Sequence, residues 1–140
     1  MNKMENSAIT GKKGEYDIIT KLMSEGFIVY TPVLDMDGVD CVVKNKHGRL
    51  IEIQIKTRTK GEGFNKDFII KREFKPHKDF FICCYLIDSD EFWFIPSFVF
   101  SKLCKRENGC CILTMDIQTE KELTGFRKER GFYTLNKEEH

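Results

Sequence analysis

The sequence lacks a long hydrophobic run, and this argues against a helix that spans a membrane. Its longest apolar stretch, residues 80–87, is far shorter than the roughly 20 residues that such a helix needs. The first six residues also lack the apolar segment of a secretory signal peptide. With no internal repeat or low-complexity segment either, we expect the 140 residues to form a single cytoplasmic domain, 1–140.

A large net charge is also missing. The formal net charge is +1, so no global positive field marks a protein that binds nucleic acid. The charges are nevertheless uneven, because residues 56–78 contain eight basic residues and only three acidic ones. Such a run is commonly a solvated surface. Contact with phosphate groups is an equally good interpretation here, because the run directly follows the acidic residues described below.

The six cysteines do not follow the spacing of a disulfide framework or a zinc site. Two adjacent pairs, Cys83-Cys84 and Cys110-Cys111, have no two-residue spacer of the zinc-knuckle kind. Most of the cysteines lie in apolar segments, where a free thiol behaves as a small hydrophobic group. Without an export signal, we predict that the thiols are reduced and that most of them are buried.

Two further kinds of site are not indicated. Gly61 and Gly63 are not followed by the lysine and the helix of a nucleotide-binding phosphate loop. His47 and His77 have no partner at the spacing of a metal site or a catalytic triad. Both histidines are therefore interpreted as surface residues.

The pattern of apolar residues predicts an α/β fold. A first helix is expected to begin near Ser7 or Thr10, to carry an apolar stripe around residues 18–23, and to end at Gly26. The remaining predicted elements are strands at 27–30, 39–44, 50–56, 68–74, 80–87, 92–95 and 110–115 and a helix at 97–103. The nearly unbroken apolar run at 80–87 is typical of a central strand covered on both faces.

This order of elements predicts a three-layer αβα sandwich around a central mixed β-sheet. We place the core at about residues 10–104 and a weakly patterned C-terminal extension at 105–140. No clear helix is indicated between residues 56 and 80.

The most informative pattern is the strict alternation within residues 50–56. Glu52, Gln54 and Lys56 fall on one face of the predicted strand, and three isoleucines fall on the other. Asp40 lies in the preceding strand. An acid, an amide and a cation beside a second acid form a suitable arrangement for holding a divalent metal ion next to a phosphate.

Oxygen ligands are available for such an ion. Magnesium prefers oxygen and keeps several of its waters, so a few protein ligands suffice. Asp40 can supply a carboxylate, Gln54 a side-chain oxygen and Ile55 a carbonyl oxygen. Glu15, on the first helix, can add a second carboxylate, and Lys56 can orient an attacking water or neutralise the phosphate.

The alternation by itself also describes ordinary surface, because any exposed strand face alternates polar and apolar residues. On this pattern alone the surface interpretation is slightly the better one. The order of three segments favours the site: Gly14-Glu15 on a helix, Asp40 on a strand, and residues 52–56 on the next strand.

That order resembles the PD-(D/E)XK nuclease superfamily, which includes type II restriction enzymes, archaeal Holliday-junction resolvases and some homing endonucleases. The resemblance covers roughly residues 10–100. Residues 11–15 are similar to the helical glycine-glutamate motif of the resolvase-like branch. Asp40 is similar to the metal-binding aspartate, and residues 54–56 to the acid-x-lysine element. Residues 92–97 resemble a segment of small members in which a strand ends in a proline and a helix follows.

The resemblance implies a restriction-endonuclease-like fold and a magnesium-dependent endonuclease that hydrolyses DNA phosphodiester bonds, with manganese as a possible substitute. It also implies a resolvase-like homodimer. The implied catalytic residues are Asp40, Gln54, Lys56, Glu15 and Glu52. The implied metal ligands are Asp40, Gln54, Ile55 and Glu15, and the implied DNA contacts are Arg58, Lys60 and Lys66.

One departure from the family keeps an alternative open. Gln54 occupies the position of the usual acid, so it retains an oxygen ligand but loses a charge, and metal affinity should fall. Glu52, on the same face, is the residue that would compensate. The alternative is a catalytically reduced nucleic-acid-binding or protein-interaction module of the same fold. An unrelated α/β domain remains a third interpretation if the three motif segments do not meet in space.

Overall fold

The computed structural model describes residues 2–34, 38–59, 67–71 and 74–138. Its centre is a five-stranded sheet with the order β1-β2-β3-β5-β6. The bounds of these strands are β1 (Ile28–Tyr30), β2 (Cys41–Lys44), β3 (Leu50–Arg58), β5 (Phe80–Leu86) and β6 (Glu91–Pro96). The sheet is mixed, because β3 and β5 are parallel and the other neighbours are antiparallel.

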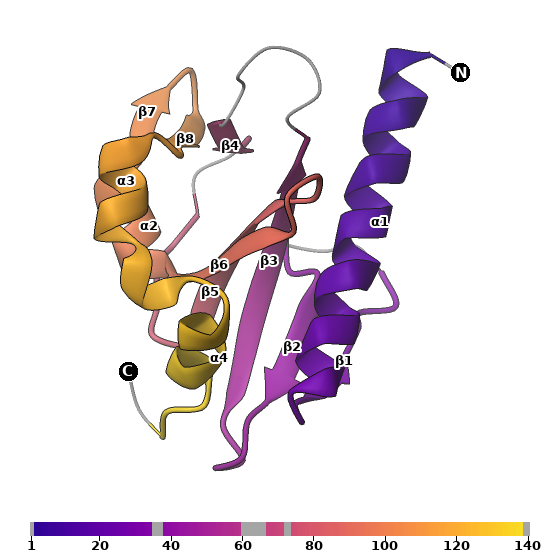
Figure 1. The fold of residues 1–140 in the computed structure, drawn as a ribbon, viewed down its shortest axis with the longest axis vertical. Helices are drawn as coiled ribbons and strands as arrows, with labels where there is room; N and C mark the ends of the chain where they lie inside the picture. Colours follow the sequence, from indigo (N-terminus) through magenta and orange to yellow (C-terminus); the bar gives the residue numbers. More distant parts are fainter. Residues whose placement is uncertain (1, 35–37, 60–66, 72–73, 139–140) are drawn as a thin grey trace.

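Helices and a smaller sheet cover the two faces of this sheet (Figure 1). The second sheet has three strands in the order β4-β8-β7. The remaining elements are α1 (Lys3–Ser24), β4 (Asp67–Ile70), α2 (Ser97–Leu103), β7 (Lys105–Glu107), β8 (Cys110–Thr114), α3 (Ile117–Glu122), η1 (Thr124–Phe126) and α4 (Glu129–Leu135). Side chains of α1 and α4 share one core, and those of α2, β4 and β8 share the other. The predicted αβα layering is confirmed.

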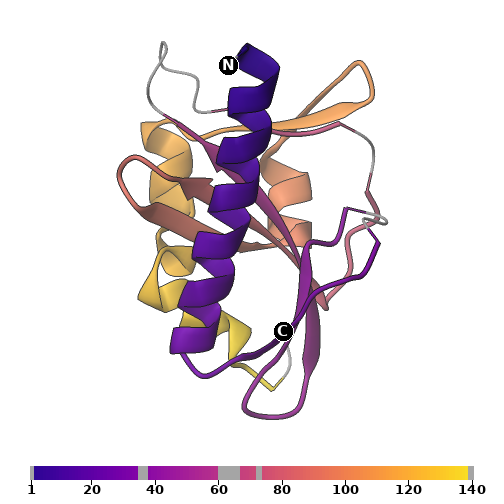
Figure 2. The ribbon, with the colours of Figure 1, turned by 90° about the vertical axis from the view of Figure 1, so that its right-hand side faces the viewer.

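Helix α1 runs across one face of the sheet (Figure 2) and begins earlier than predicted. Asn2 caps it, because the Asn2 side chain accepts a hydrogen bond from the Glu5 N–H and the Glu5 carboxylate accepts one from the Asn2 N–H. This capping box satisfies two of the free donors at the helix start, so neither Ser7 nor Thr10 is needed. The predicted end at Gly26 is confirmed by its φ of +91°, a conformation that favours glycine.

Strand β5 is the central strand that its apolar run predicts. All seven of its residues are buried. Alternate side chains enter the two cores, so Cys83 faces the α1 side and Cys84 faces the second sheet. Burial raises the pKa of both thiols, as expected for cysteines that act as hydrophobic groups.

The crossover from β3 to β5 contains no helix within its described residues. It contains β4, which overlaps the strand predicted at 68–74; residues 72–73 of that prediction lie outside the described residues. This strand ends at Ile70 and pairs with β8 in the second sheet rather than joining the first.

No helix within the described parts of the chain combines the length and apolar character that crossing a membrane requires.

Residues 105–138, the described part of the weakly patterned C-terminal extension, include a helix that packs closely against the first sheet. Phe132 and Leu135 of α4 lie in the same core as α1. The Asn45 side-chain amide, in the turn after β2, donates to the Leu135 carbonyl at 2.9 Å and to the Lys137 carbonyl at 2.8 Å. Helix α4 is therefore tied to the sheet by both apolar packing and hydrogen bonds.

We expect Gly131→Ala to loosen the packing of α4 against the first sheet. A Cβ at Gly131 would lie 2.6 Å from the Phe126 carbonyl oxygen and 2.9 Å from Cδ2 of Phe94. Because a backbone oxygen cannot rotate away, overpacking should lower the free energy of unfolding by about 1–3 kcal/mol. The measurement is urea unfolding followed by circular dichroism. Gly125→Ala is the matched control, because a Cβ there meets nothing within 4 Å. Equal urea midpoints for the two variants would contradict the expectation.

Candidate functional site

Asp40 is fixed to strand β3 by two hydrogen bonds. Cys41 pairs with Ile53 across β2 and β3, so Asp40, one residue earlier, lies beside Gln54. The Asp40 N–H donates to the Ile53 carbonyl at 2.9 Å. The Asp40 carboxylate oxygen Oδ2 accepts from the Ile55 N–H at 2.6 Å. A charged acceptor on a backbone N–H is among the stronger hydrogen bonds, so this carboxylate is held in place.

The side chains of β3 point alternately to the two faces of the sheet, as predicted. Ile51, Ile53 and Ile55 are buried in the core that also contains α1. Gln54, on the opposite face, is only 8% exposed, and its neighbours on that face, Glu52 and Lys56, are half-buried. An ordinary surface row would leave the middle amide in solvent. The burial of Gln54 therefore favours the site interpretation over the surface one.

Glu15 approaches this region because α1 and β3 touch at a glycine. A Cβ at Gly14 would lie 1.9 Å from Thr57 Oγ1, so only glycine permits the observed closeness. Burial, and then the charges of Asp40 and Glu15, raise the pKa of the Cys41 thiol to about 12. Both carboxylates thus act on the same buried group. The three motif segments therefore lie next to one another, but Gln54 and Lys56 point to the face of β3 opposite the core that contains α1.

Lys12 is a cation that the sequence analysis did not assign to this group. Its Nζ lies 3.3 Å from Glu15 Oε2, one helical turn away on the exposed side of α1. The pKa of Lys12 is raised, first by the hydrogen bond to Glu15 and to a smaller extent by the charge of Asp40. The i, i+3 spacing of the two residues is the signal that identifies such a pair in a sequence.

The basic residues predicted to act at the phosphate or to contact DNA are only partly described. Lys56 lies opposite Cys84 in the parallel pairing of β3 with β5. Arg58 is the last residue of β3, and its carbonyl accepts from the Ile87 N–H at 3.1 Å. Lys60 and Lys66 lie outside the described residues. Lys56 and Arg58 therefore mark the carboxyl end of the site strand.

His77 has a partner that its position in the sequence does not reveal. Its Nε2 lies 3.8 Å from Glu52 Oε2, and both side chains are about half exposed. The ring stacks on Phe80 with centroids 5.7 Å apart. His77 is exposed, as predicted, and the crossover brings it back beside β3. His47, in the turn between β2 and β3, is exposed as predicted.

The potential metal ligands of the site are all oxygen atoms. Two carboxylates, one amide and one main-chain carbonyl suit a hard divalent cation such as magnesium better than zinc. Within the part of the chain that the structure describes, no group of three or more histidine, cysteine, aspartate or glutamate side chains is placed to hold a metal ion. The ligand set of Asp40, Glu15, Gln54 and Ile55 contains only two such side chains.

The chain is similar in fold to the solved structure of a bacterial homing endonuclease, I-Ssp6803I. The TM-score is 0.64, the sequences are 20% identical, and the match covers 93% of this chain and 91% of that one. No family model matches the chain, and no curated protein matches it. This chain therefore shares the fold of a homing endonuclease over nearly its whole length.

Proposed function

We propose that this protein is a metal-dependent endonuclease of the PD-(D/E)XK type that hydrolyses DNA phosphodiester bonds. The observation that carries the proposal is the Asp40 carboxylate, which β3 holds beside the buried Gln54, with Lys56 on the same face. The similarity in fold to a bacterial homing endonuclease supports the choice of DNA as the substrate.

Magnesium, or manganese in its place, is the proposed cofactor. Asp40, Glu15, the Gln54 side-chain oxygen and the Ile55 carbonyl would hold it, because these groups are hard oxygen donors. When bound, the ion would stabilise negative charge on the phosphate and lower the pKa of a water molecule. Glu52 would add negative charge to the same face where Gln54 lacks it.

The chain's own cations act on the substrate. Lys56 would neutralise charge that develops on the scissile phosphate or orient the attacking water. Arg58, together with Lys60 and Lys66, would contact the DNA backbone, which positions the duplex but carries no sequence information. A resolvase-like homodimer is part of the proposal, because two copies of the site would cut both strands of a duplex in one bound complex.

The test is a cleavage assay with supercoiled, linear and branched DNA in magnesium, in manganese and in a chelator. We expect the wild-type protein to cut in either metal and to be inactive in the chelator, and we expect Lys56→Ala to lose most of the cleavage. Cleavage that survives in the chelator, or in Lys56→Ala at the wild-type rate, would contradict the proposed site.

A catalytically reduced DNA-binding module is the second candidate. The neutral, buried Gln54 favours it, because the site then holds one carboxylate fewer than the family pattern provides. The same assay separates the two candidates. Binding of DNA without cleavage in either metal would support the module and exclude the nuclease.

We expect Gln54→Glu to tighten magnesium binding about tenfold, which corresponds to about 1.4 kcal/mol. The substitution keeps the shape of the side chain and restores a negative charge beside Asp40. Without metal the buried new charge should lower the melting temperature, and magnesium should reverse this loss. Melting curves across a magnesium titration measure both effects. Gln118→Glu, on the exposed surface of α3, is the matched control. Identical magnesium dependence in the two variants would refute this role for Gln54.

A further inference from the structure

Residues 74–79 form an irregular segment that leads into β5 and is nevertheless firmly anchored. The His77 N–H donates to Ser97 Oγ at 3.0 Å, and that hydroxyl donates back to the His77 carbonyl at 2.9 Å. Ser97 itself is fully buried. The Phe74 ring packs edge-on against Phe80 and Phe100, with centroids 5.8 and 5.9 Å apart. One buried hydroxyl and an aromatic cluster therefore hold the segment at two points.

A largely buried arginine anchors the end of the segment. Arg49 donates from Nη2 to the Lys78 carbonyl at 2.6 Å and from Nε to the Asp79 carboxylate at 2.8 Å. The Glu52 N–H donates to the Asp79 carbonyl at 2.8 Å. This last bond joins the segment directly to β3, two residues from Gln54.

The anchored segment presents basic side chains at the edge of the candidate site. Lys75, His77 and Lys78 are exposed, and His77 faces Glu52. The Asp79 carboxylate is paired with Arg49, so it does not cancel the charges of Lys75 and Lys78. Within the described residues, neither lysine forms an ion pair. A fixed backbone with exposed cations loses little conformational freedom when it binds an anion.

We infer that residues 74–79 are a preorganised DNA-backbone-binding loop that contacts phosphates through Lys75, Lys78 and His77. The inference rests on the proposed nuclease function. Arg58 and Glu52 lie six residues apart on β3, which is about 20 Å at roughly 3.3 Å per residue. The loop lies at the Glu52 end and Arg58 at the other. Because phosphates of one strand recur about every 3.4 Å along the duplex axis, the bound DNA strand would span about six steps between them.

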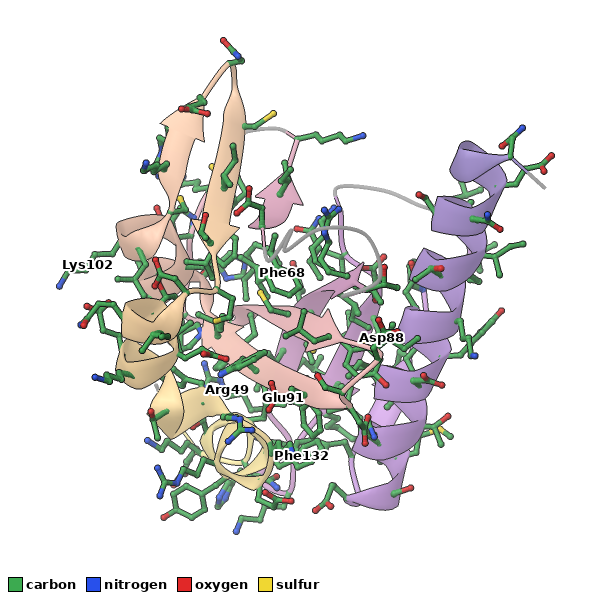
Figure 3. The ribbon with its side chains drawn as sticks, turned by 45° about the horizontal axis from the view of Figure 1, so that its top comes forward. Arg49, Phe68, Asp88, Glu91, Lys102 and Phe132 are labelled. Atoms are coloured by element: carbon green, nitrogen blue, oxygen red, sulfur yellow. The ribbon has the colours of Figure 1, made fainter. Side chains whose placement is uncertain are left out.

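The test compares two pairs of exposed lysines with the same spacing. Lys75→Gln/Lys78→Gln removes the proposed contacts, and Lys102→Gln/Lys105→Gln removes the same charge from α2 and β7. Lys102 points away from the body of the molecule (Figure 3). Binding of a fluorescently labelled duplex is followed by anisotropy in a chelator, at several salt concentrations, after equal melting temperatures have been verified.

We expect the slope of log affinity against log salt to become shallower by about 2 in the loop variant, because each lost phosphate contact removes about 0.9. The control pair should keep the wild-type slope. Equal slopes in both variants would overturn the inference and leave the proposed function standing. Absence of DNA binding by the wild-type protein would overturn both.

A second comparison isolates His77. His77→Gln should weaken binding several-fold, whereas His47→Gln, an exposed histidine in the turn between β2 and β3, should leave it unchanged. Equal affinities of the two histidine variants would remove His77 from the loop's contacts.

Discussion

Asp40→Asn is expected to lower DNA cleavage by about 10²–10³-fold while the protein stays folded, which corresponds to the loss of about 3–4 kcal/mol of charge stabilisation. The amide oxygen of the substituted side chain can still accept the Ile55 N–H, which the native carboxylate accepts at 2.6 Å. The substitution removes the negative charge and replaces the other carboxylate oxygen with an amide group that donates. The substitution therefore separates the role of Asp40 in catalysis from its role in holding β2 against β3.

The measurements are the rate of plasmid nicking and the urea midpoint of the same preparation. Asp116→Asn is the matched control, because the Asp116 carboxylate also accepts a backbone N–H, from Thr119 at 2.8 Å, and caps α3 away from the site. Asparagine caps helices about as well as aspartate. Asp40→Ala should in addition lose about 1–3 kcal/mol of stability, because the buried Ile55 N–H loses its acceptor. Plasmid nicking by Asp40→Asn at the wild-type rate would contradict the proposed site.

Gly14→Ala should damage both stability and cleavage. The new Cβ would lie 1.9 Å from Thr57 Oγ1, 2.6 Å from its Cγ2 and 2.7 Å from its Cβ. Rotation of the threonine moves the first two atoms but not the third, so α1 must shift away from β3. We expect a loss of about 1–3 kcal/mol in the free energy of unfolding. Because Glu15 is the next residue, its carboxylate moves with the helix, and cleavage should require more magnesium.

Two further variants test this expectation by urea unfolding, because they should change the free energy of unfolding in the opposite direction. Gly11→Ala lies one turn earlier on α1, where a Cβ meets nothing within 4 Å, so it should stabilise the protein by up to about 1 kcal/mol through helix propensity. Thr57→Ala combined with Gly14→Ala removes the two nearest atoms and should restore part of the loss. A Gly14→Ala protein as stable as the Gly11→Ala protein would disprove the close contact.

The strands were predictable because period-two patterns and apolar runs are local properties of a sequence. Residues 80–87 predict β5, and the alternation in 50–56 correctly assigns the two faces of β3. The positions of the strands in the sheet could not be predicted in the same way. The bond from Ile55 to Asp40 depends on the register of two strands, which no single strand contains.

The contacts that the sequence analysis missed join segments that are distant in the chain. His77 meets Glu52 only because of the route of the crossover. Phe132 and Leu135 reach the core from a seven-residue helix, which is too short to show a clear helical period. The start of α1 is a different case. Its signal is local, because the capping box of Asn2 and Glu5 is visible in the sequence, and it was nevertheless missed.

The pairing of β4 with β8 has a consequence for synthesis of the chain. Asp67 and Thr114, which share a hydrogen bond across this pair, are 47 residues apart. When the ribosome has delivered β1 to β6, the first sheet has all its strands, but β4 has no partner until β8 emerges. The strand in the crossover, β4, is therefore among the last strands to find its partner. A chain arrested before residue 110 would carry a strand with unpaired edges, which is a known route to aggregation.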